Sequence, residues 1–306
     1  MTGNEKPILT MLVGLPGAGK STYAKLLSIE DDMGEIFSSD KIRKEINGDE
    51  SSQENNDKVF SILHSRIKKN LIDGKNAIYD ATNIHSTYRK HFLDSLKGID
   101  CVKRCEIILT SYYECCRACM ERERQVPRDI VRNMYMHWNT PYYFEGWDEI
   151  LLVYNYGRLK TVDDFLFNER FTNQYNKHHR MTLGEHCKNV GQMLSKYGKV
   201  LEIAGYLHDS GKPFTRTFRN HEGIKTEDAH YYQHHCTGAY DSLLYDYDKN
   251  VNPLDVSILV NLHMEPYFWG KENISYEKAA GKYQKLWGEK LFNNVMLLHD
   301  ADVKCH

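Results

Sequence analysis

A glycine-rich loop near the start of the chain is the first candidate site. Residues 14–22 read GLPGAGKST and match the pattern G-x-x-x-x-G-K-[ST] in full. Glycines allow backbone amides to surround phosphate oxygens, Lys20 would contact the β- and γ-phosphates, and Ser21 would hold Mg²⁺. We therefore expect a nucleotide-phosphate site that is formed by Gly14, Gly17, Gly19, Lys20, Ser21 and Thr22.

Polar residues also follow the second and third expected strands. They would lie at the carboxyl edge of the sheet, where open α/β sheets bind ligands. Asp40 could accept the proton of an attacking hydroxyl, and Arg43 could hold a phosphate of the acceptor. The alternative is a helix-capping aspartate followed by an exposed arginine. Asp80, at the end of a third strand, is a candidate for ordering Mg²⁺ or its water, or else a turn-forming residue.

Several arginines crowd a helical segment that is interrupted at Pro127. Arginines on a lid can neutralise the charge of a phosphoryl group during its transfer. The alternative is a solvated basic face paired with glutamates, which is the commoner role of such a cluster. The arginines are Arg117, Arg122, Arg124 and Arg128, and the neighbouring glutamates are Glu121 and Glu123.

In the second half, His208 and Asp209 stand side by side, with His186 before them and Asp302 after them. Imidazole and carboxylate together are a donor set that suits Mn²⁺, Fe²⁺, Co²⁺, Ni²⁺ or Zn²⁺ better than Mg²⁺ alone. Asp302 shares its helical face with apolar residues, so a carboxylate there is costly unless something binds it. Asp300 has a more mixed face and ranks second. The apolar neighbours of Asp302 are Leu291, Val295 and Leu298.

Further histidines could complete a second metal position. His230, His234 and His235 fall in one expected helix, and His263 falls in another. A lone histidine is more often a surface or hydrogen-bonded residue than a ligand. Several potential ligands in one helical region nevertheless favour a metal site.

The elements that must hold these residues alternate in the first half of the chain. Ile8–Val13 is a continuous apolar run, which predicts a buried parallel strand before the glycine-rich loop. Further strands are expected at 35–38, 77–79, 106–109 and 150–154, with helices at 20–29, 57–71 and 88–96. This alternation predicts an α/β domain, a parallel sheet with flanking helices.

The second half is predicted to be all-α. Thr182–Glu185 matches a capping box, and Gly198 stands where that helix would end. Further helices are expected at 199–210, 227–245, 253–263, 275–287 and 290–304. The expected organisation is an α/β domain at 1–156, a polar linker with one short helix at 157–180, and a helical domain at 181–306.

The bulk composition limits the possible partners. The 306 residues are 41% hydrophobic and 27% charged, with a formal net charge of −2. The chain is therefore not a basic nucleic-acid coat protein, and any polyanion site must be a local patch. No apolar run approaches a membrane span, and the eight cysteines without a secretory leader favour reduced thiols. We expect a cytoplasmic protein that does not contact membranes.

Residues 8–150 resemble the kinase domain of phage polynucleotide kinases, which phosphorylate 5′-hydroxyl ends of RNA or DNA. The likeness lies in GLPGAGKST, in SSDKIR, in DATN followed by Arg89, and in RACMERERQVPRDIVRNMY. It implies that ATP is the phosphate donor and that Lys20 and Ser21 contact its phosphates and Mg²⁺. It also implies that Asp40 is the general base.

The same resemblance implies roles for three arginines. Arg43 would contact the 3′-phosphate of the acceptor, and Arg117 would face the ATP phosphates with one later lid arginine. The spacing between Arg117 and Pro127 leaves Arg122 and Arg124 open for that second role, and we favour Arg122. Many small-molecule kinases share the loop and the lid.

Residues 180–306 resemble the HD phosphohydrolase superfamily, whose pattern is H…HD…D on a bundle of helices. HHCTGAY at 234–240 is similar to the segment that supplies an extra histidine in binuclear members. HDSGKP places Lys212 as the family's substrate-phosphate lysine. The implied mechanism is attack of an activated hydroxide on phosphorus. The implied primary ligands are His186, His208, Asp209 and Asp302, and the further ones are His234 and His263.

Together the halves predict a bifunctional enzyme that heals nucleic-acid ends. Many nucleases leave RNA with a 5′-hydroxyl and a 2′,3′-cyclic phosphate, so sealing needs one phosphate added and another removed. Known end-healing enzymes pair these two modules with the HD module first, whereas here it comes second. We expect nucleic-acid ends as substrates, RNA rather than DNA, and a separate ligase as partner. The kinase site would use ATP and Mg²⁺, and the HD site Mn²⁺, Ni²⁺, Co²⁺, Zn²⁺ or Fe²⁺.

Two other hypotheses stay open. One is a small-molecule or nucleoside kinase fused to an HD nucleotidase, whose pocket should close over its substrate, whereas a pocket for an RNA end should be wide and rimmed by Lys and Arg. The other is a nucleotide-controlled regulatory module that only binds. Intact Lys20, Ser21 and Asp40 beside a full ligand set argue against the latter. If the chain is phage-encoded, its compartment would be the host cytoplasm.

Overall fold

A computed structural model describes residues 6–29, 34–52, 54–155, 160–176, 180–269 and 275–305. The chain divides into two compact units. The first contains residues 1–131 and 141–156, and the second contains 132–140 and 157–306.

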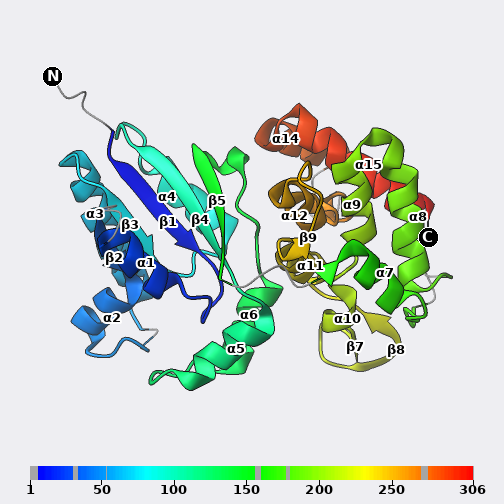
Figure 1. The fold of residues 1–306 in the computed structure, drawn as a ribbon, viewed down its shortest axis with the longest axis horizontal. Coiled ribbons are helices and arrows are strands. Elements are labelled where there is room, and N and C mark those ends of the chain that lie inside the picture. The colour runs from blue at the N-terminus through cyan, green and yellow to red at the C-terminus, as the bar shows by residue number, and fades with distance from the viewer. Residues whose placement is uncertain are drawn as a thin grey trace. The chain divides into compact units, whose positions relative to one another are not determined.

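The first unit is built on a five-stranded sheet in which all neighbouring strands are parallel (Figure 1). Its strand order is β2-β3-β1-β4-β5. From β1, the chain continues first to the strands on one side, β2 and β3, and then to those on the other side, β4 and β5. Open parallel sheets bind ligands at such a change of direction. The predicted α/β fold is confirmed. The strands are β1 (Ile8–Val13), β2 (Glu35–Ser38), β3 (Ala77–Asp80), β4 (Val102–Leu109) and β5 (Glu149–Tyr154).

Helices connect these strands, and the strand register brings the candidate site residues to one edge. Leu12 on β1 and Ser38 on β2 both pair with Asp80 on β3, so the three strands end level with one another. The loop after β1 and the start of α2 therefore lie at the carboxyl edge of the sheet. The helices are α1 (Lys20–Ile29), α2 (Ser39–Asn47), α3 (Asn56–Ile72), α4 (Ser86–Asp94), α5 (Tyr112–Glu121), α6 (Arg128–Met136) and the short η1 (Tyr143–Glu145).

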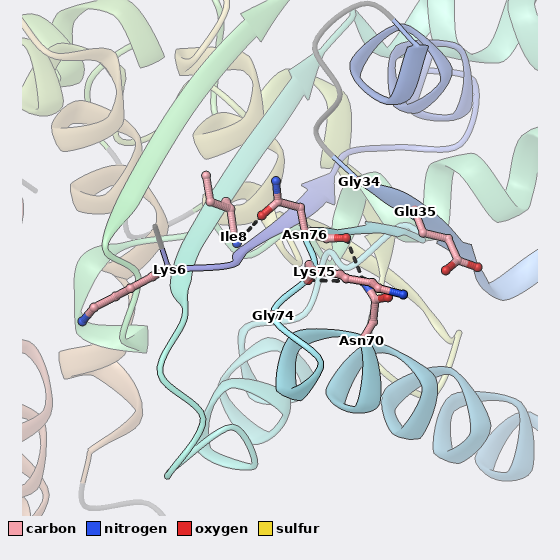
Figure 2. Close-up of a pocket in the computed structure, with 8 residues that line it drawn as sticks. All are labelled: Lys6, Ile8, Gly34, Glu35, Asn70, Gly74, Lys75 and Asn76. Atoms are coloured by element: carbon pink, nitrogen blue, oxygen red, sulfur yellow. Dashed lines mark hydrogen bonds between the residues drawn. The ribbon is translucent and has the colours of Figure 1, made fainter. Parts of the chain in front are cut away.

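A surface hollow lies near the starts of β1, β2 and β3, at the opposite edge of the sheet (Figure 2). Asparagine amides fasten the chain there. Asn76 Oδ1 accepts a hydrogen bond from the Ile8 amide at 2.8 Å, and Asn70 Nδ2 donates to the Asn76 carbonyl at 2.8 Å. Because ligands bind at the carboxyl ends of parallel strands, we interpret these amides as structural.

The second unit is mainly helical. The predicted capping box at Thr182 is present, with Thr182 and Glu185 each bonded to the other's backbone amide. Gly191 on α8 and Gly205 on α9 bring these helices close together, since a Cβ on Gly205 would lie 2.8 Å from Gly191 Cα. The helices are α7 (Val162–Glu169), α8 (Leu183–Leu194), η2 (Ser195–Tyr197), α9 (Lys199–Leu207), α10 (Lys212–Thr215), α11 (His234–Ser242), α12 (Pro253–Leu262), α13 (Glu265–Phe268), α14 (Tyr276–Trp287) and α15 (Glu289–Lys304).

The prediction of one helix across 227–245 is wrong in its first part. Residues Lys225–His230 form strand β8, which pairs antiparallel with β7 (Thr217–Arg219). Gln233 has a φ of +62°, a left-handed conformation that separates the strand from α11. His230 therefore lies on a strand, whereas His234 and His235 begin a helix. A further short parallel pair joins β6 (Lys160–Thr161) to β9 (Tyr245–Asp246).

The segment expected as a linker with one short helix, 157–180, contains β6 and α7. Thr161 caps α7 through a capping box with Asp164, and Phe165 on α7 is buried. Helix α7 packs against α8 within the second unit.

The segment 132–140 also belongs to the second unit. Trp138 is fully buried, with its ring centroid 4.9 Å from that of Tyr240. The Thr140 amide donates to Asn261 Oδ1 at 3.1 Å, and its hydroxyl lies 2.7 Å from that of Ser257. Helix α6 thus begins in the first unit and ends in the second.

All eight cysteines are free and buried. Among the described helices there is none long and apolar enough to cross a membrane.

Candidate active sites

The loop between β1 and α1 depends on two glycines in left-handed conformations. Gly17 and Gly19 have φ values of +81° and +95°, which glycine adopts without strain. A Cβ on Gly17 would collide with the Cys115 carbonyl, and one on Gly19 would lie 2.6 Å from Asn155 Nδ2. A side chain at either position would therefore distort a loop whose amides must approach phosphate oxygens closely.

Lys20 and Ser21 begin α1 directly after this loop. Lys20 is buried, and its Nζ donates to the carbonyl oxygens of Gly14 and Leu15 at 3.0 and 2.8 Å. Burial lowers the pKa of Lys20, and the nearby Asp80 carboxylate opposes that shift. Ser21 Oγ donates to Asp80 Oδ2 at 2.8 Å. A hydroxyl beside a carboxylate fits Mg²⁺, which prefers oxygen ligands.

Asp40 lies in the first turn of α2, and an arginine contacts each of its carboxylate oxygens. Arg43 Nη1 lies 2.7 Å from Oδ1, and Arg124 Nη1 lies 2.8 Å from Oδ2. The Asp40 side chain keeps 46% of its exposure, whereas that of Arg43 keeps only 11%. Ser38, not Asp40, is the N-cap of α2. Asp40 is therefore an oriented carboxylate that a substrate can reach.

Arg117 is exposed on α5. Its guanidinium pairs with Glu114 and, at 3.9 Å, with Glu121 on the same helix. These pairs agree with the alternative interpretation of the sequence, in which the arginines form a solvated basic face paired with glutamates. Reaching a phosphate would require Arg117 to exchange these partners.

Arg122 and Arg124 differ in what they contact. Arg122 lies close enough to Lys20 for its charge to lower the pKa of the lysine further. Arg124 pairs with Asp40 at 2.8 Å and with Glu50 at 3.8 Å. Of the two arginines, Arg122 is thus near the phosphate loop and Arg124 near the expected acceptor side.

The second unit brings buried metal-ligand candidates together from several helices. Two groups of donor atoms each lie within 4.8 Å of one another, and Asp209 belongs to both. The first group is His186, His208 and Asp209, and the second is Asp209, His234 and His263. Among the residues that the structure describes, His230 and His235 belong to neither group.

Asp302 joins the first group. Its Oδ1 lies 3.1 Å from His186 Nε2 and 3.4 Å from His208 Nε2. Asp209 Oδ2 lies 3.5 and 3.3 Å from the same two nitrogens. Asp302 is buried while Asp300 on the same helix is exposed. Two imidazoles and two carboxylates thus converge on one position, and Asp300 is not among them.

The second group shares the other oxygen of Asp209. Its Oδ1 lies 3.2 Å from His234 Nε2, which in turn lies 3.2 Å from His263 Nε2. Asp209 therefore directs one oxygen toward each group. Asp209 would therefore serve as a ligand in either group.

The histidines also share a hydrogen-bond arrangement that suits metal binding. Each places Nδ1 at 2.7 to 3.2 Å from a backbone carbonyl. An Nδ1–H that donates to a carbonyl leaves Nε2 with a free lone pair, the usual tautomer of a metal ligand. The pairs are His186 with Cys305, His208 with Gly205, His234 with Tyr231, and His263 with Val260.

Carboxylates dominate the charge of this centre. Burial opposes protonation of His208, but Asp209 and Asp302 outweigh burial and raise its pKa to about 10. Burial likewise opposes ionisation of Asp209, yet Lys212 and His208 hold its pKa well below the ordinary value. The carboxylates that favour a proton on His208 would equally favour a divalent ion in place of that proton, so both the donor set and its charge fit divalent metal ions.

Lys212 stands at the edge of the same centre. Its Nζ lies 2.7 Å from Asp209 Oδ2 and donates to Gln174 Oε1 at 2.8 Å. The ammonium also lies 5.3 Å from the centroid of the Tyr231 ring. A phosphate beside the metal ligands would therefore meet a fixed positive charge.

Some orienting residues could not be identified from the sequence. Gln174 holds Lys212, Tyr267 Oη donates to Asp302 Oδ2 at 3.0 Å, and Asn155 Nδ2 donates to a carbonyl of the phosphate loop. Each partner lies far away along the chain, and none of the three residues belongs to a recognisable motif. Only the position of Asn155 directly after a predicted strand was a usable signal.

Comparisons with known families agree with the division into two sites. Residues 9–141 match the AAA domain family, and residues 183–304 match the HD domain family. The chain joins an AAA domain to an HD domain. The AAA domain contains the phosphate loop and the arginine segment, and the HD domain contains the metal-ligand candidates and Lys212. The predicted P-loop kinase fold followed by a helical HD domain is confirmed, and the pair supports an enzyme with a kinase half and a phosphohydrolase half.

A curated relative of the AAA domain is the L-seryl-tRNA(Sec) kinase of Methanococcus maripaludis. It is 26% identical over 147 residues, which are 46% of this chain and 56% of that protein. The chain thus spans about half the length of this relative.

Two solved structures that the chain resembles in part match less than half of it. One, of a Pnkp1/Rnl/Hen1 complex, is 23% identical over 40% of this chain and 41% of that chain, with a TM-score of 0.35. Another, a gluconokinase from Sinorhizobium meliloti 1021, is 15% identical over 49% of this chain and 83% of that chain, with a TM-score of 0.35.

Proposed function

We propose that this protein heals broken RNA ends: its AAA domain phosphorylates a 5′-hydroxyl, and its HD domain removes phosphate from a 2′,3′-cyclic or 3′-phosphate end. The observation that carries the proposal is that each unit brings together its own set of residues suited to phosphate chemistry, the glycine loop with Lys20 in one and the histidine–aspartate groups with Lys212 in the other. The AAA domain of the chain also has a relative whose name, L-seryl-tRNA(Sec) kinase, includes an RNA.

In the kinase reaction, the acceptor hydroxyl would approach Asp40 at the carboxyl edge of the sheet. Contacts from Arg43 and Arg124 orient the Asp40 carboxylate, which would accept the hydroxyl proton. Arg43 would hold the acceptor phosphate next to the reacting end. Mg²⁺, with ligands from Ser21 and Asp80, would offset charge on the ATP phosphates.

On the donor side, ATP phosphates would lie in the glycine loop, formed by residues 14–22. Lys20 would exchange its loop carbonyl partners for β- and γ-phosphate oxygens. Arg122, near Lys20, and Arg117 would stabilise the charge on the transferring group.

In the hydrolytic reaction, the HD residues would hold one or two divalent ions through Nε2 and carboxylate oxygens. Bound metal ions supply Lewis-acid activation of water and phosphate. Lys212 would hold the substrate phosphate, with Gln174 and Asp209 keeping its ammonium in place. The primary ligands would be His186, His208, Asp209 and Asp302, with His234 and His263 for a second ion.

The test uses an RNA with a 5′-hydroxyl and a 2′,3′-cyclic phosphate, incubated with the full chain, ATP, Mg²⁺ and Mn²⁺. Both ends should change. Lys20→Met should abolish only 5′ phosphorylation, and His208→Ala with Asp209→Ala should abolish only the 3′ reaction. Lys25→Ala, an exposed change on α1, is the control for Lys20. Loss of both reactions from either variant would contradict independent sites.

The alternative is a small-molecule or nucleoside kinase fused to a nucleotidase. The same incubation tests it when free nucleosides and mononucleotides replace the RNA. Phosphorylation of nucleosides without any change in the RNA ends would replace our proposal with this one.

The products of the proposed reactions, a 5′-phosphate and a free 3′ end, are what a nucleic-acid ligase joins. We therefore propose a separate ligase as the partner in the same sequence of reactions. A DNA with the same ends, compared at equal concentration, measures the expected preference for RNA.

A further inference from the structure

A small aromatic surface with one arginine lies next to Lys212 in the HD unit. Tyr175 and Phe218 are large rings that keep 51% and 41% of their exposure. Their centroids lie 5.9 Å apart, and the exposed Arg216 has its guanidinium carbon 5.6 Å from the centroid of the Tyr175 ring. We call Tyr175, Arg216 and Phe218 the aromatic platform.

The backbone of Tyr175 is held in an uncommon conformation. Its φ is +47°, in the left-handed region that bulky residues rarely adopt. The Tyr175 amide donates to Asn173 Oδ1 at 2.6 Å, and its carbonyl accepts from the Ala229 amide at 2.7 Å. The fold thus fixes the strained residue on both sides and still leaves its ring in solvent. Strain of this kind is concentrated at functional sites.

The platform is connected to the phosphate-binding end of the HD site. Gln174, which precedes Tyr175, accepts the hydrogen bond from Lys212 Nζ. The Tyr231 hydroxyl donates a hydrogen bond to the Gln174 carbonyl, and the Tyr231 ring lies beside the Lys212 ammonium. A phosphate held by Lys212 would therefore have the platform as its neighbour on the side of Gln174 and Tyr231.

We propose that the aromatic platform binds the nucleobase of the nucleotide whose phosphate the HD site hydrolyses. This inference rests on the proposed function of the HD site. Aromatic faces and guanidinium planes stack on unpaired bases, and this stacking tolerates every base because each has a π-face. One cation and two rings beside a phosphate anchor match a single base with its phosphate, rather than a long strand. The expected specificity is for a base, not for a particular sequence.

Equilibrium binding tests the platform without relying on turnover. Adenosine 3′-thiophosphate and ribose 3-thiophosphate, which has no base, are titrated calorimetrically into the Mn²⁺-supplied protein. The Arg43→Gln background removes the acceptor contact of the kinase site. The adenosine ligand should bind about 5- to 150-fold more tightly, the range of one stacked base. Equal affinities would overturn the proposal.

Substitutions then assign the effect to the platform. Tyr175→Ala should remove most of the advantage of the adenosine ligand and leave ribose 3-thiophosphate unchanged, whereas Tyr175→Phe should keep it. Tyr197→Ala is the matched control, because Tyr197 is 49% exposed with the Lys196 ammonium 5.0 Å from its ring, at the far end of α8 from His186. An equal effect of Tyr175→Ala on both ligands would also overturn the proposal.

The two proposals fail in different ways. Base-dependent binding without hydrolysis of cyclic-phosphate RNA would reject end healing and keep the platform. Hydrolysis of that RNA with base-independent binding would reject the platform and keep end healing.

Discussion

His186, His208, His234 and His263 show how a site can be prepared at the level of single atoms. In three of them the carbonyl that accepts from Nδ1 belongs to the residue three positions earlier. The local backbone therefore selects the tautomer, and long-range packing only has to bring the rings together.

Asp302→Asn tests our proposal that Asp302 completes the primary ligand set. An amide keeps the size of the carboxylate and removes its charge, so metal affinity should fall at least about tenfold. Metal content after dialysis, measured by mass spectrometry, and phosphatase activity should fall together. Asp300→Asn, an exposed change on the same helix, should alter neither. Metal loss in the Asp300 variant instead would contradict the assignment.

Arg122→Ala and Arg124→Ala should affect the kinetic constants differently. Arg122 lies near Lys20, where it would contact the ATP phosphates and the transferring group, so its loss should raise KM for ATP as well as lower kcat. Arg124 orients Asp40, so its loss should lower kcat while KM for ATP changes little. Charge-assisted hydrogen bonds are worth about 1.5–3 kcal/mol, which corresponds to about 10- to 150-fold. Steady-state kinetics with varied ATP separates the two, and identical effects would contradict distinct roles.

Motif spacing was sufficient to predict residues that belong to recognisable patterns, and helical faces favoured Asp302 over Asp300. The orienting residues Gln174 and Tyr267 were not predictable, because their partners are 38 and 35 positions away. Such contacts depend on how helices pack, which spacing along one helix does not encode.

At the scale of elements, the hairpin of β7 and β8 could not be predicted from the pattern of apolar residues. Its strands are mostly polar and have only one buried residue, Ala229, so they lack the alternation of apolar residues that identifies a half-buried strand. Hydrogen bonds to residues far away in the sequence, such as that between Ala229 and Tyr175, hold the hairpin in place. The buried strand β1 was predictable because its apolar run is continuous.

The contact of α3 with β3 and α4 should make stability depend on pH. Burial, followed by the charges of Lys68 and His91, lowers the pKa of His64 from 6.5 to about 4. Its ring stacks on Phe92 at 4.3 Å and lies 2.9 Å from the Tyr79 hydroxyl. Protons therefore bind the unfolded chain preferentially, so this stability is complete above pH 6.5 and is lost as pH falls toward 4.

The expected loss is on the order of 1–2 kcal/mol, after allowance for the partial exposure of the ring. Urea unfolding between pH 7 and pH 4 measures it. His64→Gln removes the titrating group and should flatten this part of the pH profile. An unchanged slope in that variant would assign the acid sensitivity to other groups.

At the scale of the whole molecule, family boundaries and structural units do not coincide. The AAA match extends to residue 141, yet 132–140 pack within the second unit. Trp138 and Thr140 contribute a buried ring and buried hydrogen bonds to that unit.

Trp138→Ala should therefore damage the HD unit although the residue lies within the AAA match. Removing a fully buried tryptophan costs about 3–5 kcal/mol, and thermal unfolding of the second unit should shift downward. Phosphatase activity should be lost at a lower temperature than kinase activity. Ile130→Ala, an exposed change on α6 shortly before this segment, should leave both transitions in place. Earlier loss of kinase activity would contradict the division of the chain.

The path of α6 has a consequence for how such a protein can be recombined. The chain passes from one unit to the other after residues 131, 140 and 156. A chimaera with a single junction between two proteins therefore cannot contain one of these units intact. A graft that took residues 157–306 alone would leave behind Trp138, and also Thr140, which bonds to Asn261 and Ser257. A graft that is meant to keep the second unit intact must therefore include residues 132–140 as well as residues 157–306.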